Sequence, residues 1–178
     1  DEAFDILPYV SALTTRLISE NDSWSLPRKY KIAFSSAPDD NAYASVSDLG
    51  FIGKIKDGKK GFAVYIAGGM GSAPQAAVKL YDFIDDSEVY NIAKAVKVLF
   101  DRYGNRKNKH AARLRFLYRS LGKDEFFKKF NEIYGEVKNS SYPPLNLNRF
   151  ETKHKTGFLI PLFLAYLKAA RVSAVSPD

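Results

Sequence analysis

The chain has 178 residues, of which 46% are hydrophobic and 14% aromatic, so it can bury a core and is not of the disordered class. It contains no cysteine, which excludes a disulfide scaffold, a cysteine-ligated zinc site and an iron–sulfur cluster held by this chain alone. The net charge is +7, and residues 104–129 account for it with nine Lys/Arg against two acids. The positive charge is therefore a local patch, which favours an anionic partner.

The first half predicts one helix and three strands. Apolar residues recur at helical spacing over residues 5–19, which predicts a helix. Residues 28–35 predict a strand, because alternate residues share a face, with Tyr30, Ile32 and Phe34 on one side. Residues 49–55 and 62–67 are typical of two strands, and the turn 56–60 between them predicts an antiparallel hairpin.

The second half predicts mostly helices. Gly68-Gly69-Met70-Gly71 ends the third strand, and Pro74 is placed to start a helix that runs to about Phe83. Three further helices are expected over residues 86–103, 107–121 and 123–134. The order predicts an α+β fold, with a small mixed or antiparallel sheet covered by helices. Residues 1–139 form the expected domain, and residues 140–178 are a linker or an unassigned C-terminal segment.

No apolar run reaches the roughly 20 residues that a membrane helix needs. The nearest candidate, 158–170, contains Pro161 and is too short, which favours a packing helix or a non-native tail. The acidic N-terminus lacks the basic start of a signal peptide and is typical of a chain entered in the middle. Together with the absence of disulfides, this predicts a cytoplasmic protein without a membrane partner.

Three motifs could bind an anion. Lys29 and Lys31 share a face of their strand, roughly 7 Å apart, where two ammonium groups repel each other unless an anion lies between them. The glycine-rich segment 68–71 lets backbone N–H groups approach an anion. Residues 104–117 form a basic segment, in which Arg106 and Arg113 share a flank if the helix starts early enough. The alternatives are a solvated strand edge, a tight strand-to-helix turn and a solvated helix face.

The sequence gives little support for a metal site or for a catalytic serine. His110 and His154 are the only histidines, and neither has a partner at metal-ligand spacing, so no metal-binding residue is predicted. No Gly-x-Ser-x-Gly nucleophile motif occurs.

Taken in order, four stretches between about Pro8 and Glu136 resemble the siroheme domain of assimilatory sulfite and nitrite reductases. They are LPRKYKIAFS (26–35), SDLGFI (47–52), the strand and glycine-rich loop 61–71, and the basic segment 104–113. That family carries two such repeats, with the cluster cysteines in the second. Here residues 35–41 take the place of the second repeat's Gly-Cys-Pro-x-x-Cys motif without cysteine, so the chain resembles the first repeat, cut away from the cysteine-bearing half.

The resemblance implies a role for five residues. Lys29 and Lys31 would face the substrate over the siroheme iron, and Arg28, Arg106 and Arg113 would contact siroheme carboxylates. Lys31 favours sulfite, because nitrite reductases tend to have asparagine at that position.

The resemblance also implies the reaction and the partners. The reaction would be the six-electron reduction of sulfite to sulfide. The cofactors would be siroheme and a 4Fe-4S cluster whose ligands lie outside this chain. The partners would be the rest of the reductase polypeptide and an electron donor such as ferredoxin or a flavoprotein. Without the cysteine that links cluster and haem, the isolated chain is expected neither to reduce sulfite nor to hold siroheme tightly.

Three alternatives stay open. The chain could belong to a nitrite reductase. The basic segment with Tyr103, Phe116 and Tyr118 would also suit a nucleic-acid backbone, although the resemblance predicts no nucleic-acid partner. A repeat that only packs against a partner would need none of this chemistry.

Overall fold

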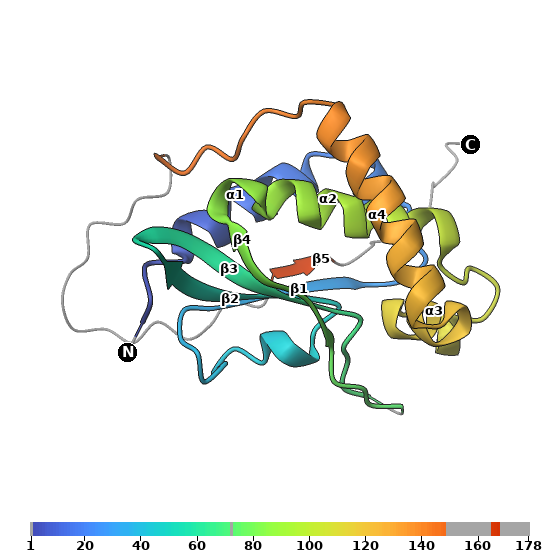
Figure 1. Cartoon of the computed structure of the whole chain (residues 1–178). Helices are drawn as coiled ribbons and strands as arrows, with labels where there is room; N and C mark the ends of the chain where they lie inside the picture. Colours follow the sequence, from blue (N-terminus) through green and yellow to red (C-terminus); the bar gives the residue numbers. More distant parts are fainter. Residues whose placement is uncertain (1, 72, 149–164, 168–178) are drawn as a thin grey trace, which may run out of the picture.

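The computed structural model describes residues 2–71, 73–148 and 165–167 (Figure 1). The helices are α1 (Leu7–Ile18), α2 (Val89–Tyr103), α3 (Leu114–Leu121) and α4 (Lys123–Asn139). The strands are β1 (Tyr30–Ser35), β2 (Leu49–Lys56), β3 (Lys59–Ile66), β4 (Val78–Asp85) and β5 (Ala165–Leu167). Within this part of the chain, no helix has both the length and the apolar character needed to cross a membrane.

The strands form one sheet in the order β4-β3-β2-β1-β5. β1 and β2 are parallel, with Ile32 opposite Leu49, and the other neighbouring pairs are antiparallel. Asp57 and Gly58 both have positive φ and form the two-residue turn between β2 and β3, as tight hairpins require. The predicted hairpin and the α+β class with a small mixed sheet are confirmed.

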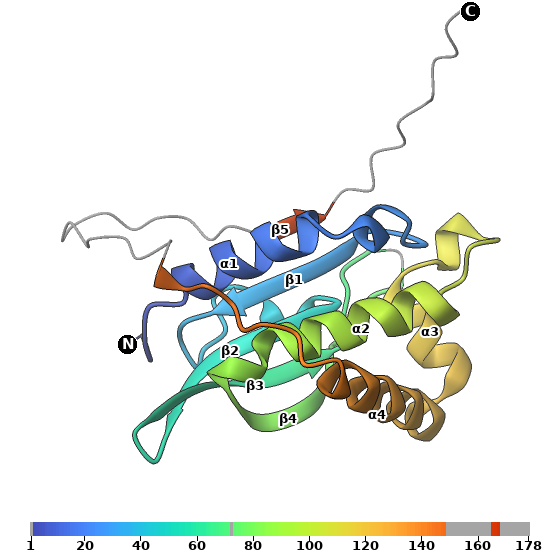
Figure 2. The same cartoon turned by 90° about the horizontal axis from the view of Figure 1, so that it is seen from above.

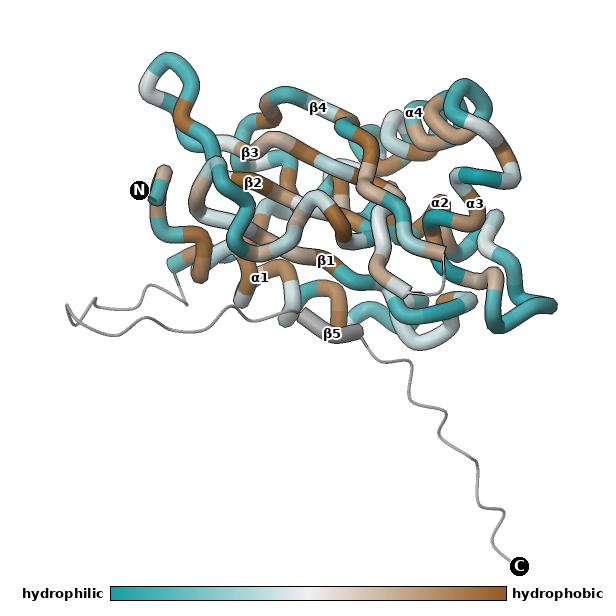
Figure 3. The backbone as a smooth tube through the Cα atoms, turned by 90° about the horizontal axis from the view of Figure 1, so that it is seen from below, coloured by the Kyte–Doolittle hydropathy of each residue, from teal (hydrophilic) through white to brown (hydrophobic). Residues whose placement is uncertain are grey.

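The two faces of the sheet are covered differently. α1 and α2 lie over one face, and α4 packs beside α2 (Figures 1 and 2). The other face carries a small cluster of Ala33, Ala44, Ile52 and Ala63 under the loop that leads into β2. Gly50 lets this loop approach, because a Cβ there would lie 2.1 Å from the Ala44 carbonyl oxygen. Figure 3 views the molecule from this side, with hydrophobic strand segments beside hydrophilic loops.

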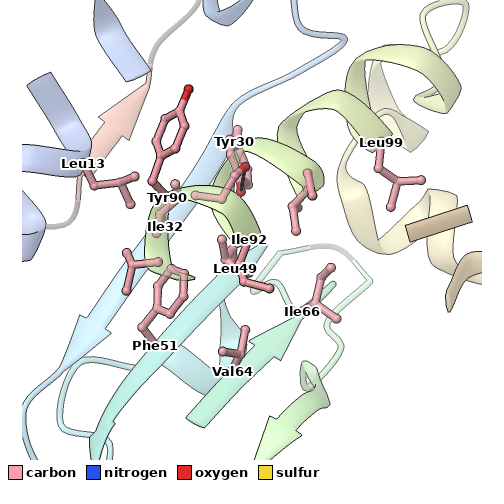
Figure 4. Packing of buried hydrophobic residues seen from close by; sticks show 14 of the residues in the cluster. Leu13, Tyr30, Ile32, Leu49, Phe51, Val64, Ile66, Tyr90, Ile92 and Leu99 are labelled. Carbon is pink, nitrogen blue, oxygen red and sulfur yellow. Dashed lines mark hydrogen bonds between the residues drawn. The ribbon is translucent and has the colours of Figure 1, made fainter. Parts of the chain in front are cut away.

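The main core lies between the sheet and the helices. Tyr30, Ile32 and Phe34 of β1 are buried there with Leu13 of α1 and Ile92 of α2 (Figure 4). Full burial of each such side chain contributes roughly 1.5–3 kcal/mol. The alternation predicted for this strand is confirmed, and it leaves the side chains of the intervening residues for the opposite face.

The predicted helix from Pro74 to Phe83 is wrong. Residues Val78–Asp85 form β4, which pairs antiparallel with β3. The segment contains β-branched and aromatic residues that suit a strand, and β3 offers an edge that satisfies its backbone groups. The edge is formed by residues earlier in the chain, so the local sequence gives no sign of it.

The predicted helix over residues 107–121 begins only at Leu114. The Asn105 side chain accepts hydrogen bonds from the backbone N–H groups of Lys107 and Asn108, and the Asn108 side chain accepts one from His110. Such side-chain turns compete with helix formation. Arg106 and Arg113 therefore do not share a helical flank.

The observed bounds of α2 and α4 lie closer to the predicted ones. α2 starts at Val89 because the Asp85 side chain caps a short 3-10 turn, Asp86–Glu88, in front of it. α4 continues beyond the predicted end to Asn139, where the sequence places the domain boundary. That boundary stays a prediction. Of the two alternatives for 158–170, a packing helix or a non-native tail, the helix is wrong at Ala165–Leu167, because these three residues pair with β1. The rest of that stretch lies outside the described residues.

Candidate functional site

Lys29 and Lys31 lie at the start of β1, on either side of the buried Tyr30. Both lysines are half-buried, and Arg28 before them is exposed. Because Tyr30 points into the helix-covered core, the alternation of the strand directs the two lysines to the opposite side.

A buried carboxylate joins this strand to the basic segment. Asp48, directly before β2, is fully buried, and its Oδ2 accepts the backbone N–H of Lys31 at 2.8 Å. The same carboxylate accepts Arg113 Nη2 at 2.7 Å and Arg113 Nε at 3.3 Å. Burial raises the pKa of the Asp48 carboxyl, and the charge and hydrogen bonds of Arg113 oppose that rise. Arg113 is thereby held beside the Lys31 backbone, although the two are far apart in the sequence.

Arg106 holds the segment that leads into β1. Its Nη1 donates to the Ser25 carbonyl oxygen at 2.6 Å, and its Nη2 donates to Asp101 Oδ1 at 2.6 Å. Gly104 packs under the same segment, since a Cβ there would lie 2.4 Å from the Phe100 carbonyl oxygen and 2.6 Å from Pro27 Cγ. The basic segment and the LPRK motif are thus in direct contact.

The contact at Gly104 can be tested by Gly104→Ala. The added methyl overlaps Phe100 and Pro27, so we expect a loss of about 2 kcal/mol in the free energy of unfolding, measured by urea denaturation. Gly135→Ala in α4 is the matched control. A Cβ built there meets no described atom within 4 Å beyond its own stretch of helix, so alanine should be neutral or stabilise by up to about 1 kcal/mol. Equal stability of the two variants would contradict the packing argument.

The glycine-rich loop connects two strands, and arginines of α3 fasten it. Gly69 and Gln75 exchange backbone hydrogen bonds at 2.9 and 3.0 Å. Arg115 Nε donates to the Ala73 carbonyl oxygen at 2.9 Å, and Arg119 donates to Gln75 Oε1 at 2.6 Å and to the Pro74 carbonyl oxygen at 3.2 Å. The strand-to-helix turn expected here is wrong, because β4 follows the loop. Sequence reasoning assigned no role to Arg115 or Arg119.

Sequence reasoning also missed an ion cluster that anchors the segment before the LPRK motif. Lys94 and Lys97 of α2 both bind Glu20 and Asp22, and Lys97 is fully buried. Burial by itself would raise the pKa of Glu20, but hydrogen bonds from Lys94, Lys97 and Tyr90 outweigh it and lower that pKa. The pKa of Asp22 is also lowered, because hydrogen bonds from Lys97 and Lys94 outweigh its burial. These residues are far apart along the chain, so spacing offered no signal.

Residues 35–41, which stand in place of the family's cysteine motif, contain a residue that stabilises the next turn. Asp40 has a positive φ, and its carboxylate accepts the backbone N–H groups of Ala44 and Ser45 at 2.7 and 2.8 Å. In the described residues, no group of three His, Cys, Asp or Glu could hold a metal ion. His110 is exposed, and His154 lies outside the described residues.

Curated proteins related to this chain are reductases. A ferredoxin–nitrite reductase of Leptolyngbya laminosa is 32% identical over 126 residues, covering 69% of this chain and 24% of the relative. A ferredoxin sulfite reductase of Mycolicibacterium paratuberculosis is 31% identical, covering 75% and 23%. An NADPH sulfite reductase hemoprotein beta-component of Chromohalobacter salexigens is 33% identical, covering 63% and 21%. This chain thus spans at most 24% of the length of these relatives.

The fold and a family model agree with these relatives. The solved structure of the Mycobacterium tuberculosis NirA protein superposes with a TM-score of 0.65 at 29% identity, covering 82% of this chain and 26% of that one. The family model described as the nitrite and sulphite reductase 4Fe-4S domain matches residues 1–138. This chain therefore belongs to the nitrite and sulphite reductase family.

Proposed function

We propose that this chain is the cysteine-free siroheme-domain repeat of a sulfite reductase, and that the complete polypeptide reduces sulfite to sulfide at siroheme. The observation that carries the proposal is the basic start of β1, with Arg113 held beside Lys31 by the buried Asp48, in a chain of this family. Relatives include both nitrite and sulfite reductases, and Lys31 supports sulfite. The cytoplasmic location stays a prediction from the sequence.

The donor set suits a cofactor with many carboxylates and an anionic substrate. Lys29, Lys31 and Arg28 are cationic and lie together at the start of β1. Arg113 uses Nε and Nη2 on Asp48, and Nη1 takes no part in that pair. A guanidinium fork is well matched to carboxylates. For Arg106, the bonds to Ser25 and Asp101 support a role in holding the segment before β1 over direct contact with the cofactor.

The chain's own contribution is to bind, orient and protonate. The two lysines would attract the anionic substrate, and their ammonium groups would supply protons during its reduction. Bound siroheme would supply the redox-active iron. A 4Fe-4S cluster does not fit this chain, because it has no cysteine. Its ligands are assigned to the rest of the polypeptide, with ferredoxin or a flavoprotein as electron donor.

The proposal is tested by Lys29→Ala and Lys31→Ala in the complete polypeptide, with reduced methyl viologen as electron source. We expect kcat/KM for sulfite to fall roughly 100-fold in each variant, because a charged substrate contact and a proton donor are lost. Siroheme content, measured from its absorbance, should not change.

Lys138→Ala, at an exposed ion pair on α4, is the matched control and should keep full turnover. Unchanged sulfite turnover in both strand variants would contradict the assignment. Turnover of nitrite alone by the unaltered polypeptide would support the nitrite alternative.

A further inference from the structure

Arg115 is a buried guanidinium that no carboxylate in the described part of the chain binds. The residue is 4% exposed, and its Nε donates to the neutral Ala73 carbonyl. Its Nη1 is buried and has no hydrogen-bond partner among the residues that the structure describes. A buried polar atom left unsatisfied in a native fold calls for an explanation, and an ionic one most of all.

The charges around Arg115 do not balance within the described residues. Asp48 already accepts two hydrogen bonds from Arg113, one from Nε and one from Nη2. Arg119 binds only neutral acceptors, Gln75 Oε1 and the Pro74 carbonyl. Burial and the charge of Arg113 lower the pKa of Arg115, Asp48 opposes this, and Arg119 adds to the lowering. A negative charge is missing from this location.

The glycine-rich loop is shaped around this guanidinium. A Cβ at Gly69 would lie 2.5 Å from Arg115 Nη1, and one at Gly71 would lie 3.3 Å from Nη2. Phe116 lies beneath both arginines, with its ring centroid 4.7 Å from Arg115 Cζ and 5.7 Å from Arg119 Cζ. The ring and the loop backbone keep the Arg115 guanidinium in one orientation.

We propose that Arg115 and Arg119 form a carboxylate-binding site at the glycine-rich loop, separate from the Arg113–Asp48 pair, and that a peripheral carboxylate of siroheme occupies it. A planar, two-oxygen acceptor matches a guanidinium fork. A permanently bound cofactor suits the site better than a free oxyanion such as sulfite, because departure of the oxyanion in each turnover would leave a buried charge unpaired. The inference rests on the proposed function, since siroheme supplies the carboxylate.

The test uses the siroheme-loaded complete polypeptide and its Arg115→Gln variant. We expect siroheme to dissociate roughly tenfold faster from the variant, followed by the decay of its absorbance, because one charge-assisted contact is lost. Arg119→Gln changes an exposed residue and should accelerate siroheme dissociation less than Arg115→Gln does. This second variant keeps the proposal testable if Arg115→Gln fails to fold. Arg102→Gln removes the same charge at an exposed pair with Glu136 and should have no effect.

The outcomes separate the sources of the anion. Unchanged siroheme retention with a roughly tenfold higher KM for sulfite would assign the site to a free oxyanion and overturn the cofactor assignment. A fall in thermal stability alone, with retention and KM unchanged, would show that the anion comes from the polypeptide and would also overturn it. Absence of siroheme from the unaltered polypeptide would refute the proposed function itself.

Discussion

Replacing Lys97 by methionine is expected to lower the free energy of unfolding of this chain by about 3 kcal/mol. Lys97 Nζ is fully buried and donates to Asp22 Oδ1 at 2.6 Å, to Ser23 Oγ at 2.8 Å and to Glu20. Methionine fills similar volume but leaves two carboxylates with fewer counter-charges in a partly buried site. Urea denaturation near neutral pH measures the loss.

The pH dependence gives an independent check of the same cluster. Glu20 and Asp22 have pKa values below their ordinary values of 4.5 and 3.8 in the folded chain. Carboxylates with a lowered folded-state pKa stabilise the fold above the unfolded-state value, and that stability is lost as the pH falls below it. The unaltered chain should therefore lose stability below about pH 4.5, and Lys97→Met should show a shallower loss.

Lys138→Met is the control for this prediction. The Lys138 side chain is half exposed, and its Nζ lies 3.5 Å from Glu88 Oε1. Its replacement should therefore lower the free energy of unfolding by less than about 1 kcal/mol. A cost that small for Lys97→Met would show that the buried cluster contributes little to stability.

Asp48→Asn is expected to cost about 3 kcal/mol of stability and to weaken siroheme binding in the complete polypeptide. Asparagine keeps an oxygen for the Lys31 N–H but removes the charge that holds Arg113, which is 15% exposed in its side chain. With Arg113 released, Arg113, Arg115 and Arg119 would all lack a carboxylate partner among the described residues. We expect siroheme to dissociate faster from this variant, followed by the decay of its absorbance, because Arg113 is the proposed contact of a siroheme carboxylate.

Asp101→Asn supplies the matched comparison. Its carboxylate pairs with Arg106 where both side chains are substantially exposed, so the stability change should stay below about 1 kcal/mol. If Asp48→Asn were equally mild and left siroheme retention unchanged, Asp48 would not be the residue that positions Arg113.

Local patterns were sufficient for much of the fold. The period of two in residues 30–34 predicted which side chains of β1 pack into the helix-covered core, because a strand places alternate residues on opposite faces. Gly58, within the predicted turn, marked the β2–β3 hairpin, since its backbone suits a tight turn. The ordered motifs also placed the chain in the family that its residues 1–138 match.

Local patterns failed where hydrogen bonds, which the hydrophobic period does not reveal, decided the backbone state. Val78–Asp85 became a strand because β3 offered an edge, and Asn105 and Asn108 postponed α3 through side-chain turns that helical spacing does not reveal. Both errors arose where hydrogen-bond partners decided between two backbone states that similar compositions allow.

By itself, the sequence determined that this chain has a small α+β fold, a concentrated basic segment, two lysines on one strand face and no cysteine for a cluster. Only the tertiary structure decided that Asp48 joins Lys31 to Arg113 and that Lys97 binds Glu20 and Asp22. It also decided that Arg115 is buried with no hydrogen-bond partner for its Nη1 among the described residues. The physical reason is that ion pairing and burial depend on which distant segments pack together, and residue spacing along the chain carries no record of that.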